Sequence, residues 1–189
     1  LCLAWLNHKK PAANWRCILN HGVAIAGAVL NDAEAIAHAT AVYHECADFF
    51  QPDGSYGESL QYGNYAFYGL MMAHEALVRR DPKLDLPLGN HYRKPVWDAH
   101  AFLYRKPLSG WGATPLARSA NFNDSAAVHR STADVLLHIA ARGKEKYPQE
   151  AGLARWLFDS LYLPIVDAGH HDRATFGFLN DFGFLSFLH

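Results

Sequence analysis

Two polar stretches in an otherwise apolar chain contain the side chains best suited to chemistry. The first, Asn20-His21-Gly22, interrupts an apolar run that begins at Asn14-Trp15-Arg16. The second starts at the turn Pro52-Asp53-Gly54 and continues into a helical pattern with one glutamate and three tyrosines: Tyr56, Glu58, Tyr62 and Tyr65. Amide, imidazole, carboxylate and phenol groups can hydrogen-bond the hydroxyls and carboxylates of sugars. The two stretches therefore favour a sugar-binding cleft.

Each of these side chains also has a purely structural explanation. Asn20 and His21 are adjacent on a helix and point about 100° apart, which fits an exposed amide beside a core imidazole as well as a pair in a cleft. Glu58, Tyr62 and Tyr65 share one face of a helix that starts near Glu58. An aromatic stripe in the core would explain the tyrosines. It would not explain Glu58, because an unpaired buried carboxylate is costly.

A cation and a loop tryptophan are further candidates for substrate contacts. Arg16 is nearest to the polar stretches and could meet an acidic substrate group, although an exposed arginine is more often simply solvated. Trp111 lies in a long segment, residues 106–123, that is rich in Pro, Gly and Ser, and such loops are often functional. Asp53 and Asp124 are most simply turn and helix-cap residues.

The histidines and cysteines show no strong metal-binding spacing. Two adjacent histidines in His170-His171-Asp172 are a weak arrangement for ligands. The cysteines Cys2, Cys17 and Cys46 are odd in number and form no CxxC pair, which argues against a disulfide framework or a zinc site. The sequence therefore predicts no metal and no cofactor.

The segments that position these residues are predicted to be helical. Asn14 and Asp32 are plausible N-caps, and Pro52-Asp53-Gly54 is a turn because Pro fixes φ and Gly accepts φ > 0. The predicted helices cover residues 14–30, 33–50, 58–80, 95–104, 124–142 and 148–161. Paired helices with short loops and no alternating strands favour an all-α fold built of αα-hairpins. The tail, residues 168–189, is rich in Gly, Phe and His, and its sequence fits a strand or a short helix equally well.

Composition narrows the function classes. Half of the 189 residues are hydrophobic and 19% are charged, so a real core can be buried. The net charge is −1, which gives no broad positive field for nucleic acid. No apolar run reaches about 18 residues, so no membrane span is expected.

The order of the polar stretches resembles a known enzyme family. Asn14-Trp15, Asn20-His21-Gly22 and Asp53-Gly54-Ser55-Tyr56-x-Glu58-x-x-x-Tyr62-x-x-Tyr65 are similar to the toroid domain of heparinase II/III-like polysaccharide lyases, in particular the alginate and oligoalginate lyases. The segment Asn121-Phe122-Asn123-Asp124-Ser125 is similar to an Asn-Phe-Gly-Asp-Ser segment of the same group. The resemblance implies an incomplete (α/α) toroid over residues 1–165. Residues 166–189 would begin a further segment, and a β-sheet domain of the same polypeptide, outside this chain, would complete the cleft.

This resemblance also implies an activity, β-elimination at a uronic acid of an anionic polysaccharide or oligosaccharide. Asn20 and His21 match the pair that holds the substrate carboxylate, and Tyr62 matches the tyrosine that protonates the leaving oxygen. Further substrate contacts are expected from Arg16, Tyr56, Glu58, Tyr65 and Trp111. The family's metal belongs mainly to the β-sheet part, so no metal ligand is transferred. A periplasmic or secreted bacterial location is implied in the same way.

Two other functions fit the residues. A toroid glycoside hydrolase would use two carboxylates from Asp53, Glu58 and Asp124, and would release saturated products. A non-catalytic helical domain would bind sugar or protein, and would bury Tyr62 and His21 in hydrogen-bonded core positions.

Overall fold

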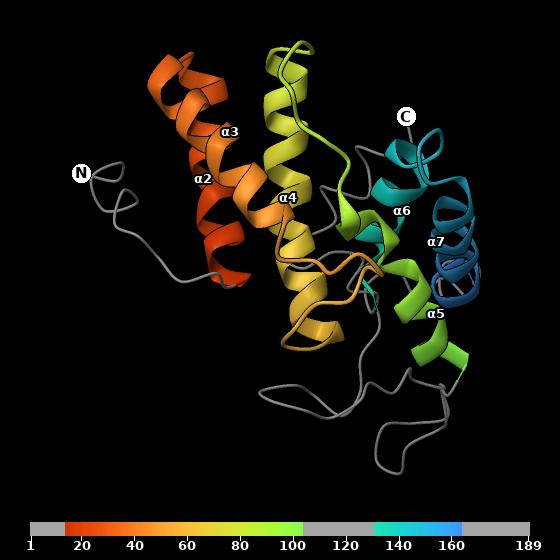
Figure 1. Ribbon diagram of the computed structural model, residues 1–189. Coiled ribbons are helices and arrows are strands. Elements are labelled where there is room, and N and C mark those ends of the chain that lie inside the picture. The colour runs from red at the N-terminus through yellow and green to blue at the C-terminus, as the bar shows by residue number, and fades with distance from the viewer. Residues whose placement is uncertain (1–13, 104–130, 164–189) are drawn as a thin grey trace.

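The computed structural model describes residues 14–103 and 131–163, and these residues form helices joined by loops (Figure 1). The elements are α2 Asn14–Leu30, α3 Ala33–Ala47, α4 Leu60–Arg80, the 3₁₀ turn η1 Asn90–Arg93, α5 Pro95–Leu103, α6 Ala133–Arg142 and α7 Pro148–Leu161. The predicted all-α class is confirmed for these residues, which contain no strand beyond an isolated bridge between Phe50 and Tyr56. The closure of the hairpins into a toroid stays a prediction.

Local capping explains the end of α2 and the starts of α3 and α4. Asn31 takes a left-handed conformation, with φ of 56°, just after α2, and the Asp32 carboxylate caps α3 by accepting from the Glu34 and Ala35 amides at 3.0 and 3.1 Å. The Ser59 hydroxyl caps α4 by accepting from the Tyr62 amide at 3.1 Å. The expectation that Glu58 lies on this helix is therefore wrong, because Glu58 precedes the cap.

The other predicted boundaries differ less or cannot be compared. Helix α3 ends at Ala47, before the predicted end at residue 50. Helix α6 is described from Ala133, and residues 124–130 of the helix predicted there are outside the described residues. Helix α7 has the predicted bounds.

Helices α2, α3 and α4 stand side by side, and α5, α6 and α7 group on the other side of α4 (Figure 1). The contact between α2 and α4 is very close, because a Cβ added at Gly69 would lie 2.5 Å from the carbonyl carbon of Cys17. Hydrogen bonds join Asn14 to Glu58 at one end of the pair and Arg80 to Asn31 at the other. Helices α2 and α4 therefore run in the same direction.

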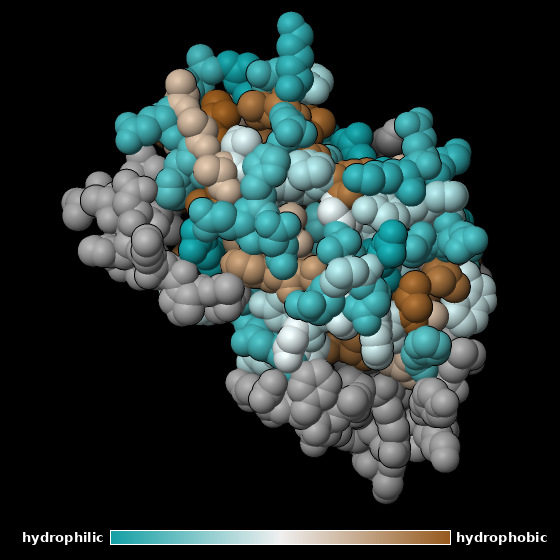
Figure 2. All heavy atoms as spheres, in the orientation of Figure 1, coloured by the Kyte–Doolittle hydropathy of each residue, from teal (hydrophilic) through white to brown (hydrophobic). Residues whose placement is uncertain are grey.

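Helix α4 is central to the core. The described core includes its large buried side chains Phe67, Leu70, Met71 and Leu77, together with residues of α3, α6 and α7. Polar residues cover most of the face shown in Figure 2, and apolar residues appear there as small separate patches. Among the described helices, none is long and apolar enough to cross a membrane.

Candidate functional site

The structure brings His21 of α2 next to Tyr68, the last of three tyrosines spaced along α4. The His21 ring meets the Tyr68 ring edge-on, with 6.1 Å between centroids. Tyr62, Tyr65 and Tyr68 follow one another at three-residue steps, so each is a surface neighbour of the next on the helix. Tyr62 and Tyr65 are half-buried, as is His21, whereas Tyr68 is buried. We call His21 with these three tyrosines the His21–tyrosine face.

Burial favours the neutral forms of two rings of this face, His21 and Tyr68. It lowers the pKa of His21 below its ordinary value, and the nearby Ile18 carbonyl offsets part of that lowering. His21 Nδ1 is buried and makes no well-formed hydrogen bond within the described residues. Burial, followed by the charge of Asp134, raises the pKa of Tyr68. A neutral imidazole and neutral phenols can donate hydrogen bonds to a bound anion.

Asn20 points to a different neighbour from His21. Its side chain is buried and its Nδ2 donates to the Ala39 carbonyl of α3 at 3.0 Å. Its Oδ1 is also buried and has no hydrogen-bond partner among the described residues. The structure therefore places Asn20 against α3 and His21 against α4, in line with their angular separation on the helix.

Three of the expected substrate-binding residues lie near the start of α2. Arg16 forms an ion pair with Glu45 of α3. Glu58 accepts a hydrogen bond of 2.5 Å from the Asn14 amide. The Tyr56 ring packs on Phe50 with centroids 5.0 Å apart, and burial, with the charges of Cys17 and Glu58 adding to it, raises the pKa of Tyr56.

Tyr56 and Glu58 line a surface hollow of about 330 Å³. Its other lining residues are Asp48, Phe49, Gln51 and Gly57. Two aromatic rings, an amide and two carboxylates face this hollow. Those carboxylates disfavour an anionic group in this position.

A buried ion pair lies next to the start of α4. Lys94 Nζ binds both carboxylate oxygens of Asp98, at 2.6 and 2.7 Å, and both side chains are almost fully buried. A Cβ added at Gly63 would lie 2.9 Å from Tyr56 Cβ and 3.5 Å from Lys94 Cε. Tyr56 and Lys94 therefore meet at Gly63, the residue after Tyr62.

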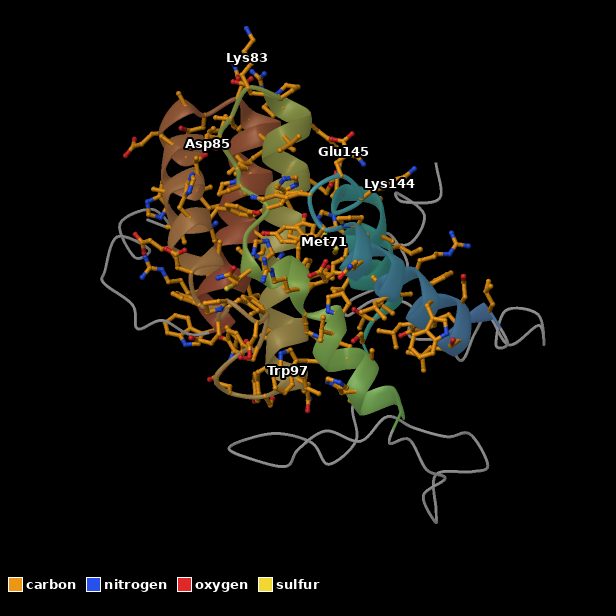
Figure 3. The ribbon with its side chains drawn as sticks, turned by 45° about the vertical axis from the view of Figure 1, so that its right-hand side comes forward. Met71, Lys83, Asp85, Trp97, Lys144 and Glu145 are labelled. Atoms are coloured by element: carbon orange, nitrogen blue, oxygen red, sulfur yellow. The ribbon has the colours of Figure 1, made fainter. Side chains whose placement is uncertain are left out.

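The Asp53 turn is docked on η1 and α5. The Asp53 carbonyl accepts from Trp97 Nε1 at 3.1 Å, and the Pro52 carbonyl accepts from Arg93 Nη1 at 3.1 Å. Gly54 has φ of 84°, and a Cβ there would lie 2.5 Å from the Arg93 carbonyl carbon. Figure 3 places Trp97 at the end of the bundle opposite Lys83, hence near the start of α4.

The Asp53 carboxylate itself is exposed, and its Oδ1 accepts from the Ser55 amide at 2.9 Å. Hydrogen bonds from Ser55 lower its pKa. Its role as a turn residue accounts for these contacts. Trp111, Asp124 and His170-His171-Asp172 are outside the described residues.

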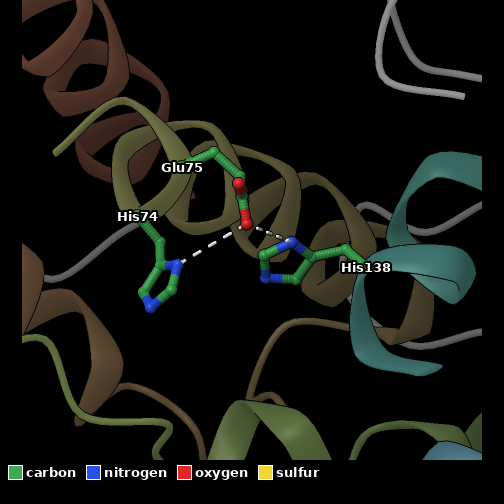
Figure 4. A group of neighbouring side chains, drawn as sticks. All are labelled: His74, Glu75 and His138. Carbon is green, nitrogen blue, oxygen red and sulfur yellow. Dashed lines mark ion pairs between the residues drawn. The ribbon is translucent and has the colours of Figure 1, made fainter. Parts of the chain in front are cut away.

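A buried cluster that the sequence reasoning missed joins α4 to α6 (Figure 4). Glu75 of α4 binds Arg142 of α6 through two hydrogen bonds of 2.7 Å and Arg79 through one of 3.0 Å. The Nδ1 atoms of His138 and His74 lie 3.4 and 3.8 Å from Glu75 Oε1. Burial alone would raise the pKa of Glu75, but interactions with His138, His74 and Arg142 outweigh it and hold that pKa well below its usual range.

Further buried rings extend this cluster. Tyr92 Oη lies 2.6 Å from His138 Nε2, and Tyr43 Oη lies 3.4 Å from His91 Nε2. Burial lowers the pKa of His138 to about 4, although Glu75 opposes the shift. Burial likewise lowers the pKa of His91 well below its ordinary value, and the charges of His138 and His74 add to the shift. The imidazoles of His138 and His91 are therefore neutral at neutral pH.

The sequence held only a weak signal for this cluster. His74-Glu75 stands in the middle of an otherwise apolar helical run. His138 follows the core residues Val135, Leu136 and Leu137, at a position where an apolar side chain would be expected. Metal-ligand patterns depend on regular spacing, and His138 reaches Glu75 only because α6 packs on α4. The cluster is therefore a product of tertiary structure.

Comparisons with known proteins provide no relative whose function could guide the interpretation of these residues. Searches against protein-family models, curated proteins and solved structures found no match to this chain. The resemblance to the heparinase II/III-like lyases, which runs roughly from Trp5 to Arg130, therefore remains a proposal that rests on the residues themselves.

Proposed function

We propose that this chain forms one side of the active site of a polysaccharide lyase that cleaves a uronic-acid-containing polymer by β-elimination. The observation that carries the proposal is the His21–tyrosine face. A half-buried neutral imidazole on α2 lies beside Tyr68 of α4, and Tyr65 and Tyr62, three and six residues earlier on that helix, are partly exposed.

The chemistry requires donors for an anion and a nearby acid. In β-elimination a general base, expected here from the β-sheet domain that would complete the cleft, takes the proton at C5 of the uronate, a double bond forms between C4 and C5, and the C4–O bond breaks as its oxygen takes up a proton. Negative charge builds on the uronate carboxyl group in the transition state, and hydrogen-bond donors directed at that group stabilise it. His21 supplies such a donor without a charge of its own.

Tyr62 is the residue assigned to proton delivery. A phenol hydroxyl can act as a general acid and give its proton to the departing glycosidic oxygen. Tyr65, one helical step away, offers an aromatic surface to the sugar rings. Asn20 is assigned a positioning role, because its bond to the Ala39 carbonyl fixes α2 on α3.

The alternatives have less support. A hydrolase needs a carboxylic acid with a raised pKa, whereas the pKa of Asp53 is lowered by its turn. A non-catalytic domain predicts that His21 and Tyr62 are core residues, whereas both are only half-buried.

The full-length protein should be incubated with alginate, heparan-type and other uronate polymers, with absorbance followed in the ultraviolet. A lyase produces an unsaturated uronate that absorbs there. Absence of an absorbance gain on every polymer would refute the proposal. Product masses separate the alternatives, because a hydrolase adds one water to each cleaved bond and leaves the products saturated.

A further inference from the structure

We propose that His74, Glu75 and His138 form a binding site for a divalent transition-metal ion of the zinc class, between α4 and α6. This site is separate from the His21–tyrosine face and does not depend on the proposed lyase reaction. Two imidazole nitrogens and one carboxylate oxygen are a donor set that zinc commonly takes.

The distances fit one ion. The candidate ligand atoms all lie within 4.8 Å of one another, and Glu75 Oε1 is 3.4 Å from His138 Nδ1 and 3.8 Å from His74 Nδ1. Two ligands bound at about 2.0–2.1 Å to a tetrahedral ion are about 3.3–3.4 Å apart. Small side-chain rotations would therefore bring the three atoms to bonding distance.

The ring orientations also favour a ligand role. His74 is buried, and its Nδ1 makes no hydrogen bond among the described residues although it faces Glu75 (Figure 4). His138 Nε2 lies 2.6 Å from Tyr92 Oη. If that nitrogen carries the proton and donates to Tyr92, the lone pair of His138 stands on Nδ1, toward Glu75. Such a partner on the second ring nitrogen is usual for metal-bound histidine.

Arg142 would compete with the ion for the Glu75 carboxylate. Its guanidinium binds both oxygens of Glu75, yet its side chain is 39% exposed and comes from the last turn of α6. Rotation toward solvent would move its charge away while leaving Glu75 Oε1 available. The arginine and the ion therefore share one carboxylate, and removing the arginine charge should strengthen metal binding.

The test is metal binding by the full-length untagged protein, stripped with a chelator and then dialysed against Zn²⁺ or Co²⁺. We expect a stoichiometric ion that is lost in His138→Gln and in His74→Gln and is kept in His38→Gln, a matched control on α3. Co²⁺ should give the visible absorbance of a four-coordinate site. Arg142→Gln should raise Zn²⁺ affinity by about tenfold or more.

Two results would overturn the site. One is equal metal content in His138→Gln and His38→Gln, and the other is unchanged or weaker Zn²⁺ binding in Arg142→Gln. Circular dichroism identifies any variant that does not fold. If His138→Gln does not fold, His74→Gln decides the matter alone, because its Nδ1 makes no hydrogen bond among the described residues.

Discussion

Neutral donors rather than charges distinguish the His21–tyrosine face. Burial keeps His21 uncharged at neutral pH, and the nearest predicted cation, Arg16, is paired with Glu45. A uronate carboxylate bound here would be held by hydrogen bonds that strengthen as charge develops during the reaction. If the proposed function is right, such neutral donors would let a chain with a net charge of −1 act on an anionic polymer.

Tyr62→Phe tests the assigned proton donor. The change removes one hydroxyl from a half-buried side chain, so the fold should be kept while turnover falls by about 10²–10⁴-fold. Initial rates of ultraviolet absorbance gain measure the loss. Tyr147→Phe is the matched control, because Tyr147 is also half-buried. Among the described residues, its hydroxyl donates a hydrogen bond to the backbone carbonyl of Leu88. Equal rates for the two variants would remove Tyr62 from the mechanism.

At the scale of elements, the predictable features were those with local causes. Asp32 capped its helix as expected, because the cap depends on residues two and three positions ahead. The sequence pattern predicts that Glu58 belongs to the helix of the tyrosines. Glu58 instead lies before that helix, because the hydroxyl of Ser59, the next residue, caps α4. The spacing of the tyrosines along α4 is readable from the sequence, whereas the contact between His21 and Tyr68 depends on how α2 packs on α4. The Glu75 cluster depends on how α6 packs on α4, which no local pattern encodes.

Gly69→Ala tests the close approach of α2 and α4. The added Cβ would lie 2.5 Å from the Cys17 carbonyl carbon, and backbone cannot rotate away as a side chain can. We expect a loss of about 1–3 kcal/mol in the free energy of unfolding, measured by urea denaturation. Gly152→Ala on α7 is the control, because its Cβ would meet nothing within 4 Å. That change should stabilise by about 0.5–1 kcal/mol. Similar effects at both positions would contradict the packing argument.

Lys94→Met tests the buried pair beside Tyr56 and Gly63. Removing the ammonium leaves the Asp98 carboxylate buried without this cation, so unfolding free energy should fall by about 3–5 kcal/mol. The double variant Lys94→Met with Asp98→Leu should recover part of that loss, because no charge then remains buried. A double variant less stable than Lys94→Met alone would show that Asp98 is held mainly by other partners.

At the scale of the whole molecule, α4 connects both halves of the described structure. One side of it packs against α2, where the His21–tyrosine face lies, and another receives Arg142 and His138 of α6. The hydrophobic content of the sequence predicts a substantial core. It does not predict that several of the polar residues buried in that core are histidines. His74, His91 and His138 are all buried. Because burial lowers the pKa of His91 and of His138, these two residues make stability depend on pH.

Stability should therefore decline on mild acidification, and His91, which is not itself a proposed metal ligand, gives a measurable part of this decline. Its pKa is well below the unfolded value of about 6.5, so the unfolded chain binds more protons in this range. Its contribution is complete above pH about 6.5 and is lost as the pH falls toward the folded pKa. His91 alone accounts for at most about 1.4 kcal/mol per pH unit.

Urea denaturation with a chelator present, at a series of pH values from 7 down to about 5, measures this slope. His91→Gln should be less stable at pH 7, because the imidazole packs against Phe67 and Tyr92, but its stability should fall less steeply with acid. Parallel slopes for His91→Gln and the unmodified protein would mean that His91 does not take up a proton on unfolding. The acid sensitivity would then belong to other buried groups.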